Sequence, residues 1–265
     1  MSDRITITIK DQIAQVRLNR ADKHNALDLE MFKAIVAAQK QIAKNRSLRA
    51  VVLGAEGDDF CSGLDVKSLM SNRRGALTLL AKWLPWQANL AQKVSVGWRR
   101  LQLPVIAAIN GRCWGGGLQI ALGADFRFVH PEASLSIMEG KWGLIPDMGG
   151  TLALPELMHR DQAMRLAMSA EVITAVRGLE LGLVTEISNA PWQDAMALAQ
   201  LLCQRSPDAV AAVKRLYRKS WSGRSGTALA RESGYQWRIL LGANQRIALR
   251  RQRGDDVEFR QAGKW

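Results

Sequence analysis

The stretch Gly111-Arg-Cys-Trp-Gly-Gly-Gly-Leu-Gln119 decides the fold of this chain. The apolar run 104–109 directly before it predicts a buried strand, and the glycine stretch predicts the turn from that strand into the start of a helix. Three glycines in a helix cost roughly 1 kcal/mol each relative to alanine when they lie in its interior. Two causes can explain such glycines: a ligand that approaches the backbone closely, or tight packing of the helix on a strand.

A second stretch, Phe60-Cys-Ser-Gly-Leu-Asp65, has the same character and follows another apolar run, 50–53. A strand that ends in a helix start leaves backbone N–H groups unpaired, with the positive end of the helix dipole behind them. Two such donors aimed at one point form an oxyanion hole, which stabilises the enolate of a thioester. The two glycine turns together therefore indicate a site for thioester chemistry.

The flanking segments predict a mixed α/β fold. Residues 4–10 and 13–18 alternate apolar and polar side chains and predict a hairpin with its turn at Asp11-Gln12. Asp28 is placed to cap a helix whose apolar residues recur at helical spacing, namely Met31, Ile35, Ala38 and Ile42. Strands that alternate with helices favour an α/β architecture with several parallel strands.

The second half of the chain is predicted to be largely helical. Short strands are expected at 133–137 and 183–187, and a loop at 143–151. Helices are expected near 191–204, 207–220 and 226–252. The segment 66–103 reads as helical with three tryptophans, Trp83, Trp86 and Trp98. These rings serve either as a lid or pocket wall, or as core packing.

Two carboxylates are candidates for proton transfer. Glu139 stands among apolar residues, and loss of water would raise its pKa toward the range useful for a general acid or base. The alternative for Glu139 is an ion pair with Lys141 or another cation. Asp147 either shapes a turn in Pro-Asp-Met-Gly-Gly or enters the same pocket as Glu139.

Composition restricts the partners. The chain has 265 residues and a net charge of +13, from 37 Lys and Arg against 24 Asp and Glu. Such an excess suits the phosphates of coenzyme A, a nucleic acid, or simply a basic surface. Since no nucleic-acid module signature is present, the pattern favours the first and third interpretations.

The histidines and cysteines give little sign of metal binding or disulfides. Three isolated histidines predict no metal site, and three cysteines without ligand spacing predict reduced thiols in a cytoplasmic protein. The polar N-terminus predicts no signal peptide. Apolar runs well below about twenty residues predict no membrane span.

Four motifs together resemble the crotonase superfamily, the enoyl-CoA hydratase/isomerase family, in order and spacing. They are Arg20-Ala-Asp-Lys-His-Asn-Ala-Leu27, Phe60-Cys-Ser-Gly-Leu-Asp-Val-Lys67, Asn110-Gly followed by Gly115-Gly-Gly117 and Asp125, and Gly143-Leu-Ile-Pro-Asp-Met-Gly-Gly-Thr151. The resemblance implies a spiral core of ββα units with a helical C-terminal region. It implies acyl-CoA substrates, no metal or redox cofactor, and homotrimers or dimers of trimers. The corresponding division is a core with the acyl-CoA site at 1–190 and a helical region at 191–265, which would serve oligomerisation and pocket closure.

The resemblance also implies roles for particular residues. The oxyanion N–H groups would come from Leu64 and Gly116. Lys67 stands where some relatives contact the phosphates of coenzyme A, and Ala26 and Leu27 fall in the segment that lines its adenine and pantetheine. The predicted substrate-binding set is completed by Ser62, Gly63, Asp65 and Gly115.

The chain departs from the family pattern at one catalytic position. Hydratases of the family use two glutamates, of which one matches Glu139 and the other falls on Gln119. Asp147 matches an acid of dienoyl-CoA isomerase-like relatives, which also have an acid at the position of Gln119. An amide orients water but exchanges no proton near pH 7.

This departure favours double-bond isomerisation, with Glu139 as acid and base and Asp147 assisting. A hydratase in which Gln119 positions the water is the alternative, and hydrolysis or C–C cleavage also stays open because one fold hosts several reactions. From another class, an acyl-CoA or RNA binding protein with little catalysis stays open as an alternative to the favoured enzyme. Neither the acyl group nor the pathway is predicted.

Overall fold

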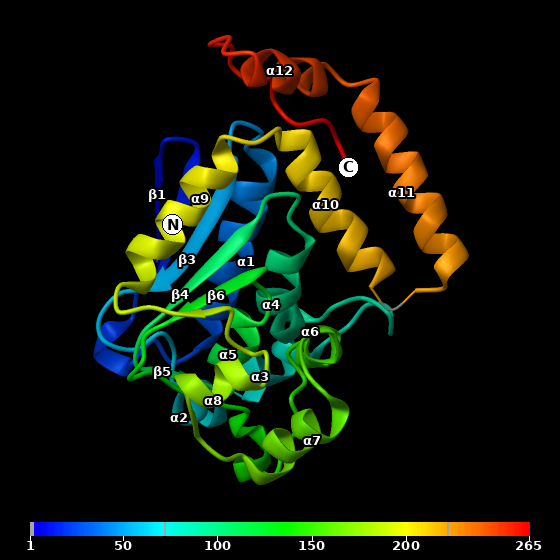
Figure 1. Ribbon diagram of the computed structural model, residues 1–265. Helices are drawn as coiled ribbons and strands as arrows, with labels where there is room; N and C mark the ends of the chain where they lie inside the picture. The colour runs from blue at the N-terminus through cyan, green and yellow to red at the C-terminus, as the bar shows by residue number, and fades with distance from the viewer. Residues whose placement is uncertain (1–2, 72, 222) are drawn as a thin grey trace.

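The computed structural model describes residues 3–71, 73–221 and 223–265, and Figure 1 shows their arrangement. Within this part, six strands form one sheet in the order β1-β2-β3-β4-β6-β9, and three form a second sheet in the order β5-β7-β8. The strands are β1 (Ile5–Lys10), β2 (Ile13–Leu18), β3 (Ala50–Ala55), β4 (Val105–Ile109), β5 (Arg112–Trp114), β6 (Phe126–Val129), β7 (Ser134–Ser136), β8 (Ile173–Thr174) and β9 (Glu186–Ile187). Apart from the antiparallel pairs β1/β2 and β7/β8, all the strand pairs are parallel.

Helices surround both sheets. The α-helices are α1 (Leu29–Lys44), α2 (Val66–Ser71), α3 (Arg73–Leu80), α4 (Leu90–Arg100), α5 (Gly116–Ala121), α6 (Gly150–Leu157), α7 (Arg160–Ser169), α8 (Ala175–Glu180), α9 (Pro191–Cys203), α10 (Pro207–Ser220), α11 (Ser225–Leu240) and α12 (Ala243–Gln252). Short 3-10 helices occur at η1 (Ala21–Lys23) and η2 (Met138–Trp142). This mixed α/β architecture with helices at the C-terminal end confirms the predicted fold class.

The central strands β3 and β4 of the six-stranded sheet are buried on both faces because helices cover each face. Val51 and Leu53 of β3 belong to a core shared with α1 and α4, whereas Ala50 and Val52 pack with Ala195 of α9 and its neighbours. Figure 1 accordingly shows α9 in front of the sheet and α1 behind it. The continuous apolar runs that predicted the central strands are the consequence of this double burial.

The N-terminal predictions are confirmed in detail. β1 and β2 pair around a turn in which Asp11 and Gln12 have φ of 50° and 64°. Asp28 caps α1 by accepting a hydrogen bond from the Met31 N–H at 2.8 Å. The apolar residues expected on the inner face of this helix are all buried.

Three segments differ from the predictions. The short strand β5 stands between β4 and the glycine turn, because it pairs with β7 in the second sheet. The helix expected over 226–252 is two helices separated at 241–242. In the segment 66–103, residues 81–89 are not helical.

The tryptophans of the segment 66–103 fall into two groups. Trp98 is fully buried in the core, whereas Trp83 and Trp86 are 90% and 78% exposed. Core packing is therefore the explanation for Trp98 alone.

The C-terminal helices contact the sheet less and less from α9 to α12. α9 packs on the sheet, and α10 is tied to it by Lys214, whose Nζ lies 2.7 Å from Asp125 Oδ2. α11 packs on α10 and has no buried residue, and with α12 it extends away from the sheet in Figure 1. The division at 190/191 stays a prediction.

Two features of the described residues relate to the composition, the helices and the cysteines. No helix among the described residues is both long and apolar enough to cross a membrane. All three cysteines are free thiols, and Cys61 and Cys113 are buried and paired by a parallel β-bridge.

Candidate active site

The glycine turn at 60–65, which is the first of the two along the chain, is held by a parallel bridge between Leu27 and Leu64. The Leu27 N–H donates to the Gly63 carbonyl at 2.8 Å, and the Asp65 N–H donates to the Leu27 carbonyl at 3.0 Å. In a parallel bridge one paired residue makes both hydrogen bonds to the two neighbours of the residue opposite it. The N–H of that opposite residue, here Leu64, points away from the partner strand. The Leu64 N–H is therefore directed away from Leu27, and no acceptor for it is found among the described residues.

The glycine turn at 111–119, the second along the chain, leads into the start of α5. Gly115 has φ of 50° and donates its N–H to the Ser136 carbonyl at 2.9 Å. Gly116 is the first residue of the helix, so its N–H has no partner within the helix. No acceptor elsewhere in the described parts of the chain takes that N–H.

The two turns are in direct contact, which explains why glycines are needed. A Cβ on Gly63 would lie 3.1 Å from the Trp114 carbonyl oxygen, and one on Gly117 would lie 2.5 Å from the Cys61 carbonyl oxygen. A Cβ on Gly116 would meet Leu27 Cδ1 at 2.8 Å. Close packing between the turns thus accounts for these glycines, and it brings the elements with Leu64 and Gly116 together.

Gln119 lies in α5 and links this helix to Glu139 and to the segment 148–150. Its Nε2 donates to Glu139 Oε1, and its Oε1 accepts from the N–H groups of Met148 at 3.0 Å and Gly150 at 3.1 Å. Gln119 is 1% exposed and Glu139 6% exposed. The predicted pair of site residues is therefore brought into contact, and the orientation of the amide is fixed by the donors around it.

The environment of Glu139 disfavours its ionised form. Burial raises the pKa of this carboxyl, its hydrogen bonds to its own backbone and to Gln119 lower it, and the charge of Asp147 raises it again, with a net rise. Its Oε2 is buried and has no hydrogen-bond partner among the residues that the structure describes.

The predicted surroundings of Glu139 hold only in part. No ion pair joins Glu139 to Lys141 or to another cation in the described residues, so that alternative is excluded there. Trp142 and Leu144, two of the apolar residues that stand near Glu139 in the sequence, are 61% and 54% exposed. The carboxyl lies instead against Gly115, where an added Cβ would stand 3.8 Å from Glu139 Oε1.

Asp147 lies near this carboxyl but is less enclosed. Burial raises its pKa, while a hydrogen bond to its own backbone and the charge of Lys82 lower it. The N-cap of α6 is Gly149, so Asp147 does not cap that helix.

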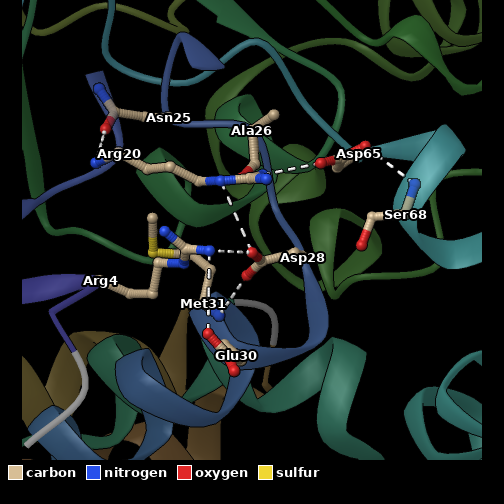
Figure 2. A network of polar contacts seen from close by, with 9 residues as sticks. All are labelled: Arg4, Arg20, Asn25, Ala26, Asp28, Glu30, Met31, Asp65 and Ser68. Carbon is tan, nitrogen blue, oxygen red and sulfur yellow. Dashed lines mark hydrogen bonds and ion pairs between the residues drawn. The ribbon is translucent and has the colours of Figure 1, made fainter. Parts of the chain in front are cut away.

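The remaining predicted substrate-binding residues line the edge of the first turn. Ser62 donates its N–H to the His24 carbonyl at 3.0 Å, and Lys67 is exposed in the first turn of α2. Asp65 and the Ala26 carbonyl are instead engaged by one side chain, Arg20, in the network of Figure 2. The sequence indicates no role for Arg20, because Asp65, which this side chain joins to the Ala26 carbonyl, lies 45 residues away in the chain.

Comparison with known proteins identifies the family that the sequence and the fold of this chain match. Residues 8–240 match the family model described as enoyl-CoA hydratase/isomerase. YngF of Bacillus subtilis strain 168, which carries the same description, is 32% identical over 237 residues, 88% of each chain. The (E)-benzylidenesuccinyl-CoA hydratase of Thauera aromatica is 30% identical over 80% of each chain. Among solved structures, an enoyl-CoA hydratase from Polaromonas sp. JS666 is 29% identical with a TM-score of 0.85, covering 98% of this chain and 99% of that one.

Proposed function

The chain belongs to the enoyl-CoA hydratase/isomerase family of acyl-CoA enzymes, and from that premise we propose that it moves the double bond of an enoyl-CoA. The proposal rests on one observation, the hydrogen bonding of Gln119. Both polar groups of its side-chain amide already form hydrogen bonds. The carbonyl oxygen accepts from two backbone N–H groups, and the NH₂ group donates to Glu139. An amide exchanges no proton near neutral pH, so proton transfer falls to Glu139.

The reaction needs one base and one oxyanion site. Glu139 takes a proton from C2 of a 3-enoyl-CoA, and the electron pair of the C–H bond moves into a dienolate. The Leu64 and Gly116 N–H groups bind the developing oxyanion. The protonated Glu139 then returns the proton to C4, which gives the 2-enoyl-CoA and restores the carboxylate. Asp147 assists by the influence of its charge on the pKa of Glu139.

Coenzyme A is proposed to lie along the first turn. Ala26, Leu27, Ser62, Gly63 and Asp65 border its path, and Lys67 is exposed where a phosphate could reach it. The net charge of +13 attracts a polyanionic ligand of this kind. In this scheme the reaction uses no cofactor beyond the coenzyme A of the substrate.

Hydration of a 2-enoyl-CoA is the second candidate, because the Thauera aromatica relative and the Polaromonas structure are named hydratases. In that case Glu139 would supply the proton exchange alone, and Gln119 would orient the water.

We further propose that the protein is a cytoplasmic homotrimer or dimer of trimers. The lack of buried residues in α11 supports a second copy as the cover of its apolar side chains.

The test is incubation of the purified protein in D₂O with a 3-enoyl-CoA and, separately, with a 2-enoyl-CoA, followed by mass spectrometry and NMR. Bond migration with deuterium at C2 or C4 and no water adduct is the expected result. A 3-hydroxyacyl-CoA product would assign the reaction to hydration instead. Binding of acyl-CoA without turnover of either substrate would contradict both candidates and favour a binding protein.

A further inference from the structure

The guanidinium of Arg20 joins the segment 26–28 to Asp65 (Figure 2). Its Nη1 donates to Asp65 Oδ2 at 2.8 Å and to the Ala26 carbonyl at 3.0 Å, and its Nε lies 3.6 Å from Asp28 Oδ2. The Arg20 side chain is 11% exposed, and those of Asp65 and Asp28 are 18% and 8% exposed. These contacts are therefore largely shielded from water, where charge-assisted hydrogen bonds are strong.

The residues bound by Arg20 flank the bridge that directs the Leu64 N–H. Asp65 directly follows Leu64 and caps α2 by accepting from the Ser68 N–H at 3.0 Å. Ala26 directly precedes Leu27, the other member of the bridge. One side chain thus binds both strands of the bridge, each at the residue next to the paired one.

The network also fixes the charge of Asp65. Burial opposes its ionisation, but the Ser68 N–H and the Arg20 guanidinium outweigh burial and hold the pKa of Asp65 below its usual range. Asp65 is therefore a carboxylate whose charge is satisfied from within the protein.

The backbone of the Arg20 loop is held from the other side by Asn25. Asn25 is fully buried, accepts the Arg20 N–H at 2.8 Å, and donates to the Glu56 and Asp59 carbonyls at 2.9 and 2.8 Å. His24 and Asn25 both have positive φ, 51° and 54°, a backbone conformation that persists only where its surroundings enforce it. The loop is thus built to hold a fixed shape.

We propose that Arg20 is a positioning residue for the oxyanion hole. By binding Asp65 and the Ala26 carbonyl together, it fixes the Leu27–Leu64 bridge and with it the direction of the Leu64 N–H. The inference rests on the proposed function, because it assumes that this N–H binds the thioester oxygen. A lysine cannot reproduce the arrangement, since it offers a point charge in place of a planar fork with several donors.

The experiment compares Arg20→Met, Arg20→Lys and Asp65→Asn with a control, Arg4→Gln. Arg4 pairs with Asp28 at 2.7 Å and with Glu30 at 3.8 Å, at the N-terminus of α1, so its loss also removes a partner of Asp28. The readouts are kcat and KM for the isomerisation and the absorption of bound cinnamoyl-CoA. Its conjugated band moves to longer wavelength when its carbonyl oxygen accepts strong hydrogen bonds.

Arg20→Met is expected to lower kcat by up to about 100- to 1,000-fold, the loss known for one oxyanion donor, with KM changed by less than about threefold. The shift of the cinnamoyl-CoA band should shrink in Arg20→Met and Asp65→Asn, recover in part in Arg20→Lys, and stay at the wild-type value in Arg4→Gln. If Arg20→Met does not fold, Asp65→Asn carries the test, since an amide of the same shape removes the charge and replaces one of the two acceptor oxygens by a donor NH₂ group.

Two results separate this inference from the proposed function. A full band shift in Arg20→Met or Asp65→Asn, or equal losses in Arg4→Gln, would overturn the positioning role and leave the proposed function intact. Wild-type protein that binds cinnamoyl-CoA without any band shift would contradict the oxyanion hole and hence the proposed function itself.

Discussion

Gln119 occupies a place bounded by two backbone N–H groups on one side and a carboxyl group on the other. An amide suits both neighbours, because its oxygen accepts from the N–H groups while its nitrogen donates to the carboxyl. A carboxylate at this position would keep the two N–H groups but would face Glu139 with a like charge. Such a pair shares a proton, and the protons leave it in two steps that belong to the pair.

The first prediction follows from that substitution. Gln119→Glu is expected to produce 3-hydroxyacyl-CoA from a 2-enoyl-CoA, because the site then contains a second group that exchanges protons with water. Product analysis by mass spectrometry measures the change, and Gln119→Met, which has a similar length and no strong donor or acceptor, is the matched control. Absence of the hydrated product in a folded Gln119→Glu protein would show that the residue at position 119 does not determine the reaction.

The second prediction concerns Glu139 itself. Glu139→Gln keeps an acceptor for Gln119 but has no exchangeable proton at neutral pH, so kcat should fall by about 100- to 10,000-fold. Stability should change in the opposite direction. The folded-state pKa of Glu139 is raised, so the wild-type protein loses stability as pH rises from the usual glutamate range through that pKa.

Glu139→Gln lacks that loss, and its thermal midpoint should therefore meet or exceed the wild-type value at neutral pH. Steady-state kinetics and thermal unfolding at pH 4 to 8 measure the two effects. Retained wild-type turnover would remove Glu139 from the role of base.

The third prediction is a pH dependence. Since the base must be ionised, kcat/KM should fall on the acid side with an apparent pKa above the usual glutamate range. Burial is the main cause, and the charge of Asp147 adds to it. Asp147→Asn removes the added charge and should move the acid limb to lower pH, and Lys82→Met, which removes a cation near Asp147, serves as the comparison. An acid limb that is unchanged in Asp147→Asn would mean that the two carboxyl groups are not coupled.

At the scale of elements, the contact between the two glycine turns gives a fourth prediction. Gly117→Ala places a Cβ 2.5 Å from the Cys61 carbonyl oxygen, a backbone atom that cannot move away cheaply. We expect a loss of about 1–3 kcal/mol in the free energy of unfolding. Gly234→Ala in α11 is the matched control, because nothing within the same protomer lies within 4 Å of its Cβ and alanine favours a helix by up to about 1 kcal/mol. Urea unfolding distinguishes the two, and equal stabilities would contradict the close packing.

The elements also show what the sequence can and cannot predict. The hairpin and α1 were predictable because their signals are local: alternation of side chains, and Asp28 before a helical pattern. β5 was not, because a strand of three residues exists only through its pairing with β7. The break at 241–242 was missed because the helical pattern alone does not reveal where one helix replaces another.

The same distinction applies to the candidate site. Glu139 and Gln119 were predicted by residue type and by the motif around them. The donors that orient Gln119 were not, because they are backbone N–H groups of Met148 and Gly150, whose position depends on the fold and not on the side chain. Arg20 was missed for a related reason, since its contacts with the segment 26–28 and with Asp65 are created only when the fold brings these two segments together.

At the scale of the whole molecule, the apolar surface is unevenly distributed. α11 has no buried residue, although several large apolar side chains on and after it are exposed, namely Leu229 at 60%, Trp237 at 66%, Leu240 at 46% and Leu241 at 79%. Each such side chain, once buried, contributes about 1.5–3 kcal/mol, so a partner for this surface is strongly favoured.

The fifth prediction is that copies of this chain supply that partner. Wild-type protein should have a mass in solution of three or six times the 29.3 kDa of one protomer, measured by light scattering after size exclusion. Trp237→Lys places a charge in the proposed interface and should yield monomers, because an unpaired charge is costly to bury. Ile9→Lys on the edge strand β1, where the isoleucine is 49% exposed, is the control and should keep the wild-type mass. A monomeric wild-type protein, or an unchanged assembly in Trp237→Lys, would show that α11 is not the surface through which the copies associate.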